Sequence, residues 1–339
     1  MIRVSAISLG IFGLVVALAA PIAAQQIVLQ QLPPARTLGA EPPPQVLNLS
    51  FDASDAQIIG HLSDGSIYAW PWDGTAPQLI AQTEQAFAYC PAGERMVISA
   101  GKAAVLLSLQ DGAYAALSEG LYDHAAFNSD CSVMILAESA TNAVEHWQIS
   151  EAPVLRTAAT LAPVQSGVAV SPDGRFFAAA TAPNLEEETV GTAIEVFQIS
   201  EDNRVQRTGR LEVPDTVLGL DGMDLTTSSV LVVASRAEDS AGILAANPAK
   251  DEQIWSWRGL ATERITAVEL SSDELLLLTG DQAGRIVLWS VSGGENLAEI
   301  NLGQPVTAAT LSKDVSRAAV ALKDGRVLVL DVDALVAAN

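Results

Sequence analysis

The side chains in this sequence that could carry out chemistry are few and widely spaced. There are two cysteines, Cys90 and Cys131, and three histidines, His61, His124 and His146. A serine nucleophile needs a histidine base within hydrogen-bond reach, and a structural zinc site needs clustered cysteines and histidines. The spacing fits neither, and the glycine patterns that bind phosphates do not occur. We therefore expect no catalytic residues, no metal site, no cofactor and a protein that is not an enzyme.

One pair of carboxylates stands out in a short, otherwise mostly apolar segment. Asp221 and Asp224 belong to the sequence LDGMD at positions 220–224. Two neighbouring carboxyl groups can act as a general acid and base, or bind a cation weakly. A solvent-exposed turn is the simpler interpretation of the same spacing, and we favour it. The choice between these interpretations depends on where the fold places the two residues.

The elements that position these residues come from a repeat. One unit recurs seven times, with its clearest copies starting at Gly167, Ile265 and Val306. Each copy contains an apolar or alternating segment, a turn similar to Ser-Pro-Asp-Gly, a second apolar segment, a turn with glycine, and a third segment ending in a large residue. This pattern predicts three β-strands joined by tight turns, and a weaker fourth strand follows in all but the last unit.

The spacing of the units predicts the architecture. The large residues near the ends of the third strands lie about 43 residues apart, within the range of a four-stranded propeller blade. These residues are Trp70, Leu107, Trp147, Phe197, Ala246, Trp289 and Leu330. We therefore expect residues 46–339 to form an all-β, seven-bladed β-propeller, with tryptophans at these positions packed between blades.

The last blade needs a fourth strand from elsewhere in the chain. Without it, the ring leaves a sheet edge unpaired. Residues 26–32 (QIVLQQL) have the composition of a strand, and residues 36–40 are a second candidate. The prolines that follow favour an extended connector. We expect residues 25–45 to comprise this closing strand and the connector; a disordered tail is the alternative.

Several copies resemble the repeats of the WD40-like family. The resemblance lies in the turn at Ser171–Gly174, DGSIYAW at 64–70, RIVLWS at 285–290 and DGRVLVLDV at 324–332. It covers most of the chain, although no unit has the family's Trp-Asp or Gly-His pair. Related YVTN or quinoprotein-like propellers are alternatives. The resemblance implies a propeller that binds partners through loops between the second and third strands and between blades.

Five carboxylates occupy two neighbouring loops of this kind. Glu186, Glu187 and Glu188 lie in one loop, and Glu238 and Asp239 lie in the equivalent loop of the next unit. We name these five residues the acidic ledge and expect them to attract a protein partner with a basic surface. A solvated loop without a partner is the alternative.

The alignment of the units places the two cysteines in adjacent blades. Cys90 takes the position of Ser171, and Cys131 takes the position of Gly174, so both lie where a first strand turns into a second. A disulfide needs Cα atoms within about 7 Å, which this placement allows. We expect a Cys90–Cys131 disulfide; two buried free thiols are the alternative.

The N-terminus and the net charge indicate the compartment and the partners. Arg3 precedes an apolar stretch that ends at Ala20, too short to span a bilayer, and small residues follow up to Ala24. We expect a signal peptide at 1–24, a periplasmic or secreted protein, and no membrane span after cleavage; an uncleaved anchor is the alternative. The net charge of −22 disfavours nucleic acid as a partner.

The function expected from these observations is a non-catalytic scaffold that binds proteins and is itself a monomer. The alternative is a propeller enzyme, similar to lactonases or hydrolases, or a propeller with a quinone cofactor, using the central channel. Catalytic residues on such folds converge from different blades, so local motifs do not reveal them. Polar residues from at least three blades meeting at the channel would favour the alternative, and a channel lined by Ala, Val and Leu would disfavour it.

Overall fold

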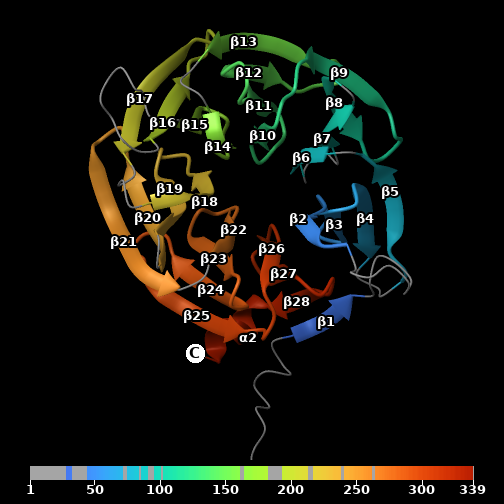
Figure 1. Ribbon diagram of the computed structural model, residues 1–339, viewed down its shortest axis with the longest axis vertical. Coiled ribbons are helices and arrows are strands. Elements are labelled where there is room, and N and C mark those ends of the chain that lie inside the picture. Colours follow the sequence, from blue (N-terminus) through green and yellow to red (C-terminus); the bar gives the residue numbers. More distant parts are fainter. Residues whose placement is uncertain are drawn as a thin grey trace, which may run out of the picture.

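A computed structural model describes residues 28–32, 44–71, 75–83, 85–90, 95–100, 102–160, 164–181, 193–212, 217–237, 240–261 and 264–338. These residues form seven four-stranded antiparallel sheets arranged around a central axis (Figure 1). The prediction of an all-β, seven-bladed propeller is confirmed. Among the described residues, no helix is long and apolar enough to cross a membrane.

Each blade runs from an inner strand beside the axis to an outer strand at the rim (Figure 1). The inner strands are β2 (Val46–Phe51), β6 (Gln85–Cys90), β10 (His124–Phe127), β14 (Val164–Val170), β18 (Val217–Leu225), β22 (Ile265–Leu270) and β26 (Val306–Leu311). The second strands are β3 (Gln57–Leu62), β7 (Arg95–Ala100), β11 (Val133–Glu138), β15 (Phe176–Thr181), β19 (Leu231–Ala237), β23 (Leu276–Asp281) and β27 (Arg317–Leu322).

The outer half of each blade contains the third and fourth strands. The third strands are β4 (Ser66–Pro71), β8 (Ala103–Ser108), β12 (Ala143–Gln148), β16 (Ala193–Ile199), β20 (Ser240–Asn247), β24 (Arg285–Ser290) and β28 (Val327–Asp331). The fourth strands are β5 (Gln78–Gln82), β9 (Tyr114–Glu119), β13 (Val154–Thr160), β17 (Val205–Glu212), β21 (Glu252–Ala261), β25 (Asn296–Asn301) and β1 (Val28–Leu32). A short helix, α2 (Val332–Ala337), follows β28.

The core of the protein is divided among the junctions between blades. All seven large residues used to define the repeat lie on third strands and are buried, so that prediction is confirmed. We number the blades 1 to 7 by their inner strands in chain order, so β19 belongs to blade 5. Each hydrophobic cluster combines residues from two neighbouring blades. Val232 of β19 packs toward blade 6, and the next residue, Val233, packs toward blade 4. Successive residues of a strand point to opposite faces, so both faces of these sheets are buried.

The ring closes through β1, as the sequence predicted. β1 pairs with β28 in antiparallel fashion, with Leu32 opposite Val327 and Gln31 opposite Leu328. Leu32 is buried in the cluster shared by blades 7 and 1, so it supplies packing as well as strand pairing. Of the two candidate segments, 26–32 therefore contains the closing strand. The backbone groups at the edge of β28 are therefore paired with β1 of the same chain.

The turns after the inner strands link neighbouring blades. Cys131 forms a disulfide with Cys90, and their Cα atoms lie 5.9 Å apart. Glu274 has the position in blade 6 that Cys131 has in blade 3, and it accepts hydrogen bonds from the Thr227 backbone and hydroxyl of blade 5 at 3.0 Å. The fourth position of one turn thus meets the beginning of the preceding blade's turn at both junctions, with an offset of three positions for the cysteines and two for Glu274 and Thr227. Crosslinking a loop of 41 residues stabilises a fold by about 3–4 kcal/mol in the chain-entropy model.

One junction between blades is more open than the others. The inner strands of neighbouring blades pack against each other around the ring, but β2 and β6 do so far less than the rest. Among the described residues, the core between blades 1 and 2 has only Ile59, Ile67, Ala69 and Met96 fully buried. Blade 2 is therefore tied to blade 3 by the disulfide and packs more loosely against blade 1.

The closure of the ring leads to a stability prediction. Replacing Leu32 by Ala should lower the free energy of unfolding by about 2–5 kcal/mol, because the substitution leaves a cavity in the core between blades 7 and 1. Urea-induced unfolding followed by circular dichroism measures this change. The matched control is Leu79→Ala on the outer strand β5, where the side chain is 55% exposed and should contribute less than about 0.5 kcal/mol. Equal effects of the two substitutions would contradict the role of β1.

Candidate functional site

A cavity of about 390 Å³ lies at the end of the central channel where the inner strands stop. All seven blades contribute to its wall through residues at or near the ends of their inner strands. Small-molecule sites in proteins typically occupy about 300–1,000 Å³, so this cavity has the size of a ligand site. The turns that follow the inner strands form its mouth, at Ala53, Ser129, Pro172, Ser272 and Lys313.

One position of the repeat divides the channel wall into two halves. This position lies two residues before each turn begins, and its occupants are Ser50, Ala88, Ala126, Ala169, Asp224, Glu269 and Thr310. Blades 2 and 3 thus present alanine to the cavity, and Ala169 of blade 4 is buried in the core between blades 4 and 5. Blades 5, 6, 7 and 1 present Asp, Glu, Thr and Ser. We call these four polar residues the polar arc. An acidic pair within the arc therefore faces an alanine-lined wall across the channel.

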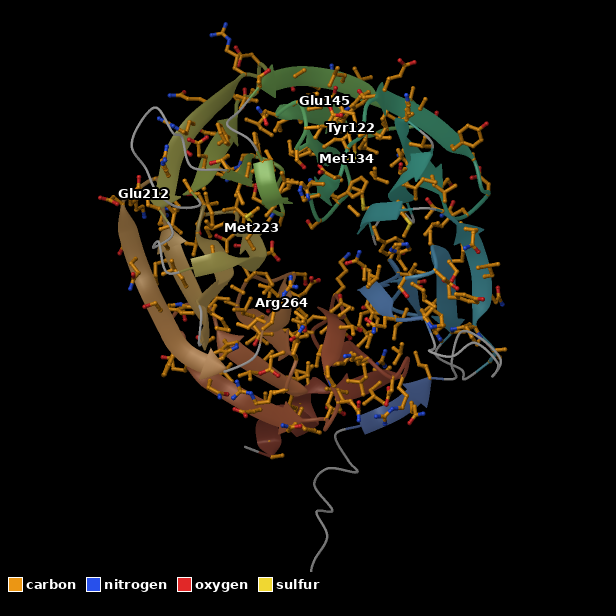
Figure 2. The ribbon with its side chains drawn as sticks, viewed as in Figure 1. Tyr122, Met134, Glu145, Glu212, Met223 and Arg264 are labelled. Atoms are coloured by element: carbon orange, nitrogen blue, oxygen red, sulfur yellow. A yellow bond between two sulfur atoms is a disulfide. The ribbon has the colours of Figure 1, made fainter. Side chains whose placement is uncertain are left out.

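Asp224 is held at the junction of blades 5 and 6 by backbone groups. Its carboxylate accepts hydrogen bonds from the backbone N–H of Leu225 at 2.8 Å and from that of Leu270 on β22 at 3.1 Å. These bonds favour the ionised form, but burial opposes it more strongly, and Glu274 nearby adds repulsion. The pKa of Asp224 is raised to about 6. Figure 2 labels Met223, the residue before Asp224 on β18, beside the central axis.

Glu269 is less well supported than Asp224. Its carboxylate accepts one hydrogen bond, at 3.2 Å, from the hydroxyl of Thr310 on β26. Burial and the nearby charge of Asp224 raise its pKa to about 8. At neutral pH, Glu269 is therefore mostly protonated while Asp224 is mostly ionised. Two carboxyl groups of this kind can donate and accept a proton, or together receive a cation.

A buried histidine borders the same cavity. His61 lies on β3, and its face of blade 1 meets the open junction with blade 2, where the cavity extends along Asn48, Ile59 and Met96. The imidazole is 5% exposed, and neither ring nitrogen has a hydrogen-bond partner among the described residues. Burial lowers the pKa of His61, which keeps the ring neutral near pH 7. Buried polar atoms normally have partners, so an unpaired imidazole here indicates room for a polar group.

A second set of buried polar side chains, between blades 2 and 3, is fully engaged in hydrogen bonds. Glu145 accepts bonds from Ser118 at 2.7 Å and from the Trp147 indole at 2.9 Å. Burial and a hydrogen bond with Glu145 hold the pKa of Tyr122 well above its usual range. Figure 2 shows Tyr122 and Glu145 near each other in blade 3, away from the axis. Because its members satisfy one another, this cluster stabilises the fold and offers no binding site.

The residues selected from the sequence are distributed unevenly. Asp224 lies in the cavity; the side chain of Asp221, on the same strand, lies outside what the structure describes, as do residues 1–27 with the expected signal peptide. His124 begins β10, and His146 is buried in β12. Among the described residues, no group of three His, Cys, Asp or Glu side chains could bind a metal ion.

The acidic ledge of Glu186, Glu187, Glu188, Glu238 and Asp239 lies outside the described residues, so it stays a prediction. The strand ends that flank its loops, in β15, β16, β19 and β20, lie on the face opposite the cavity mouth.

Glu269, Thr310 and His61 are site residues that we did not predict from the sequence. A signal for the first two existed, because aligning the units on their turns puts Glu269 and Thr310 in register with Asp224. For His61 no such signal existed, since its place in the cavity depends on the open junction between blades 1 and 2.

Comparisons with known proteins support the fold class. No family model matches the chain, and no curated protein sequence matches it. Among solved structures, the chain is similar to hydrazine synthase from Kuenenia stuttgartiensis, with a TM-score of 0.66 and 12% sequence identity. The match covers 87% of this chain and 99% of that one. At this identity the similarity shows the β-propeller fold alone.

The raised pKa values predict how stability changes with pH. The folded protein binds a proton on Glu269 more tightly than the unfolded chain does, so stability should fall as pH rises from about 4.5 to about 8. Asp224 contributes in the same direction between about 4 and 6. Glu269→Gln should reduce the fall by on the order of 2 kcal/mol, measured by urea unfolding at pH 5 and pH 8.5. Glu119→Gln, an exposed control on β9, should keep the dependence of the wild type. Parallel curves for wild type and Glu269→Gln would refute the assignment.

Proposed function

We propose that this chain is a non-catalytic binding propeller that receives a ligand, or a side chain of a protein partner, in the central cavity. The observation that carries the proposal is the convergence of Asp224, Glu269 and Thr310, from three blades, on one wall of that cavity. Enclosing carboxyl groups with few hydrogen-bond partners costs stability. A fold that retains such groups in a cavity of ligand size is expected to use them for binding.

We also propose that the protein works in the periplasm or outside the cell. The N-terminal sequence has the layout of a signal peptide, and disulfides such as Cys90–Cys131 persist mainly in oxidising compartments. The repeat motifs support membership of the WD40-like propellers. Protein purified from the periplasmic fraction of its native host should begin at Gln25 and contain no free thiol. Retention of residues 1–24 in the mature protein would favour the uncleaved anchor, and absence of the protein from the periplasmic fraction would contradict export.

Acid–base catalysis in the channel is the second candidate function. It is favoured by the convergence of polar residues from blades 5, 6 and 7 on the channel, which is the arrangement expected of a propeller enzyme. It is also favoured by the carboxyl pair itself, because Asp224 and Glu269 prefer different protonation states near neutral pH. The two functions differ in the fate of the ligand. A binding protein returns its ligand unchanged, whereas an enzyme converts it with a rate that depends on both carboxyl groups. Mass spectrometry of a ligand after prolonged incubation distinguishes them, and our proposal expects unchanged ligand.

A cavity-filling substitution tests the proposed binding site. Ala126 lines the cavity on the alanine side, so Ala126→Met should occupy space that a ligand needs. In a thermal-shift screen of a metabolite library, compounds that stabilise the wild type should stabilise Ala126→Met much less, by about tenfold in affinity. Ala116→Met, on the exposed face of β9, is the matched control and should retain binding. Ligands that bind all three proteins equally would place binding outside the cavity.

A further inference from the structure

We infer that the group received by the central cavity is an organic ammonium carried on an aromatic or apolar body. The inference rests on the proposed function, since it assumes that the cavity binds a ligand, and it adds the chemical class of that ligand. A free amine and the lysine side chain of a partner protein share this chemistry. Four features of the cavity carry the inference: its acceptors, its buried histidine, its apolar wall and its charge.

The acceptors of the polar arc match an ammonium group. Such a group has up to three N–H donors and needs acceptors in a small volume. Asp224 and Glu269 supply carboxylate oxygens, and Thr310, already bonded to Glu269 at 3.2 Å, supplies a hydroxyl oxygen. Hydrogen bonds between charged partners are about twice as strong as neutral ones. The two carboxyl groups from neighbouring blades therefore form the strongest candidate contact for a positive group.

His61 gives an independent indication of a ligand. Its ring is nearly fully buried against the cavity, and neither nitrogen has a partner among the described residues. A neutral imidazole offers one acceptor and one donor nitrogen. It can accept a hydrogen bond from a second N–H or donate one to an oxygen of the ligand. His61 is thus a second polar group in the cavity, besides the acidic pair, to which a ligand can form hydrogen bonds.

The wall opposite the acidic pair suits an apolar body. Ala88 and Ala126 leave space at the repeat position where blades 5 and 6 carry Asp224 and Glu269. Beside them, Tyr89 and Phe127 line the cavity from blades 2 and 3. Aromatic rings accept both apolar surface and the face of a cation. A ligand with its ammonium at the polar arc and an aromatic body across the channel fits both walls.

The charge of the cavity favours a cation and links its binding to proton release. The titratable or charged groups that line the cavity are Asp52, Asp55, His61, Tyr89, Asp224, Glu269 and Lys313, with Glu274 behind Asp224. Lys313 is the one lysine or arginine among these described lining residues, and it lies exposed at the mouth. A bound ammonium favours the ionised form of Glu269, whose pKa of about 8 keeps it protonated in the empty cavity. At pH 7 binding should therefore release about one proton.

Titration calorimetry of the mature chain with three matched probes tests the inference. The probes are 2-phenylethylamine, 2-phenylethanol and 3-phenylpropionate, which differ in charge but share the phenyl body. We expect the amine to bind at least about tenfold more tightly than the other two, since the acceptors lie in an enclosed site. Titrations in phosphate and PIPES, whose ionisation enthalpies differ and which carry no primary ammonium group, should reveal release of about one proton at pH 7. Nα-acetyl-lysine methylamide, which keeps its side-chain ammonium, is a further probe and represents a lysine of a partner protein. Its affinity relative to that of 2-phenylethylamine shows whether the cavity prefers a protein side chain or a free amine.

A conservative variant locates the binding. Glu269→Gln mimics the protonated side chain and should fold, yet it should weaken amine binding by about tenfold and abolish proton release. Glu119→Gln, the exposed control, should change neither.

Equal binding of amine, alcohol and carboxylate, tighter binding of Ca²⁺ or Mn²⁺ added alone, or no binding of either ammonium probe would overturn the inference. A neutral or anionic ligand that Ala126→Met excludes would leave the proposed function intact. Failure of the proposed function would appear differently, as ligands insensitive to Ala126→Met.

Discussion

The structure depends on one constraint, which is that both faces of every blade must be covered. Val232 and Val233 are neighbours in sequence, point to opposite faces of blade 5, and are both almost completely buried. A sheet of this kind needs a neighbour on each side, and a closed ring supplies two neighbours to every blade without a terminal face. The pairing of β1 with β28 completes the last sheet, and Leu32 completes the core between the last blade and the first.

The residues that line the channel differ in chemistry from blade to blade. At the position two residues before each turn, six of the seven side chains line the cavity, whereas Ala169 is buried in the core between blades 4 and 5. Alanine meets the structural requirement in blades 2, 3 and 4, and acidic or hydroxyl side chains replace it in blades 5, 6, 7 and 1. This asymmetry in an otherwise regular repeat gives the cavity two chemically different walls. A site can thus arise from one position per blade without disturbing the fold.

The sequence was sufficient to predict the architecture because the relevant information is local and repeated. Turns, apolar segments and large residues such as Trp70 and Trp289 recur at blade spacing, and the strand composition of 26–32 indicated the closing segment. The pairing of the cysteines also followed from the alignment, although only the structure shows that the fourth turn position of one blade lies beside the beginning of the preceding blade's turn. The carboxyl pair could not be recognised locally, since Asp224 and Glu269 are 45 positions apart and adjacent only in the ring. The environment of His61 depends on how tightly blades 1 and 2 pack, which no local sequence pattern encodes.

The antiparallel pairing of β1 with β28 also determines when the fold can be completed. Leu32 meets Val327, which follows it by about 300 positions, so β1 must wait for β28 before the last sheet is complete. At about 5–20 residues per second, the intervening stretch of roughly 300 residues takes about 15–60 s to make. During that interval blades 1 to 6 can assemble as an open arc, but the two faces that will flank blade 7 remain exposed to solvent. The incomplete ring is therefore more prone to aggregate than the finished one. The exposed faces are covered only when β1 pairs with β28.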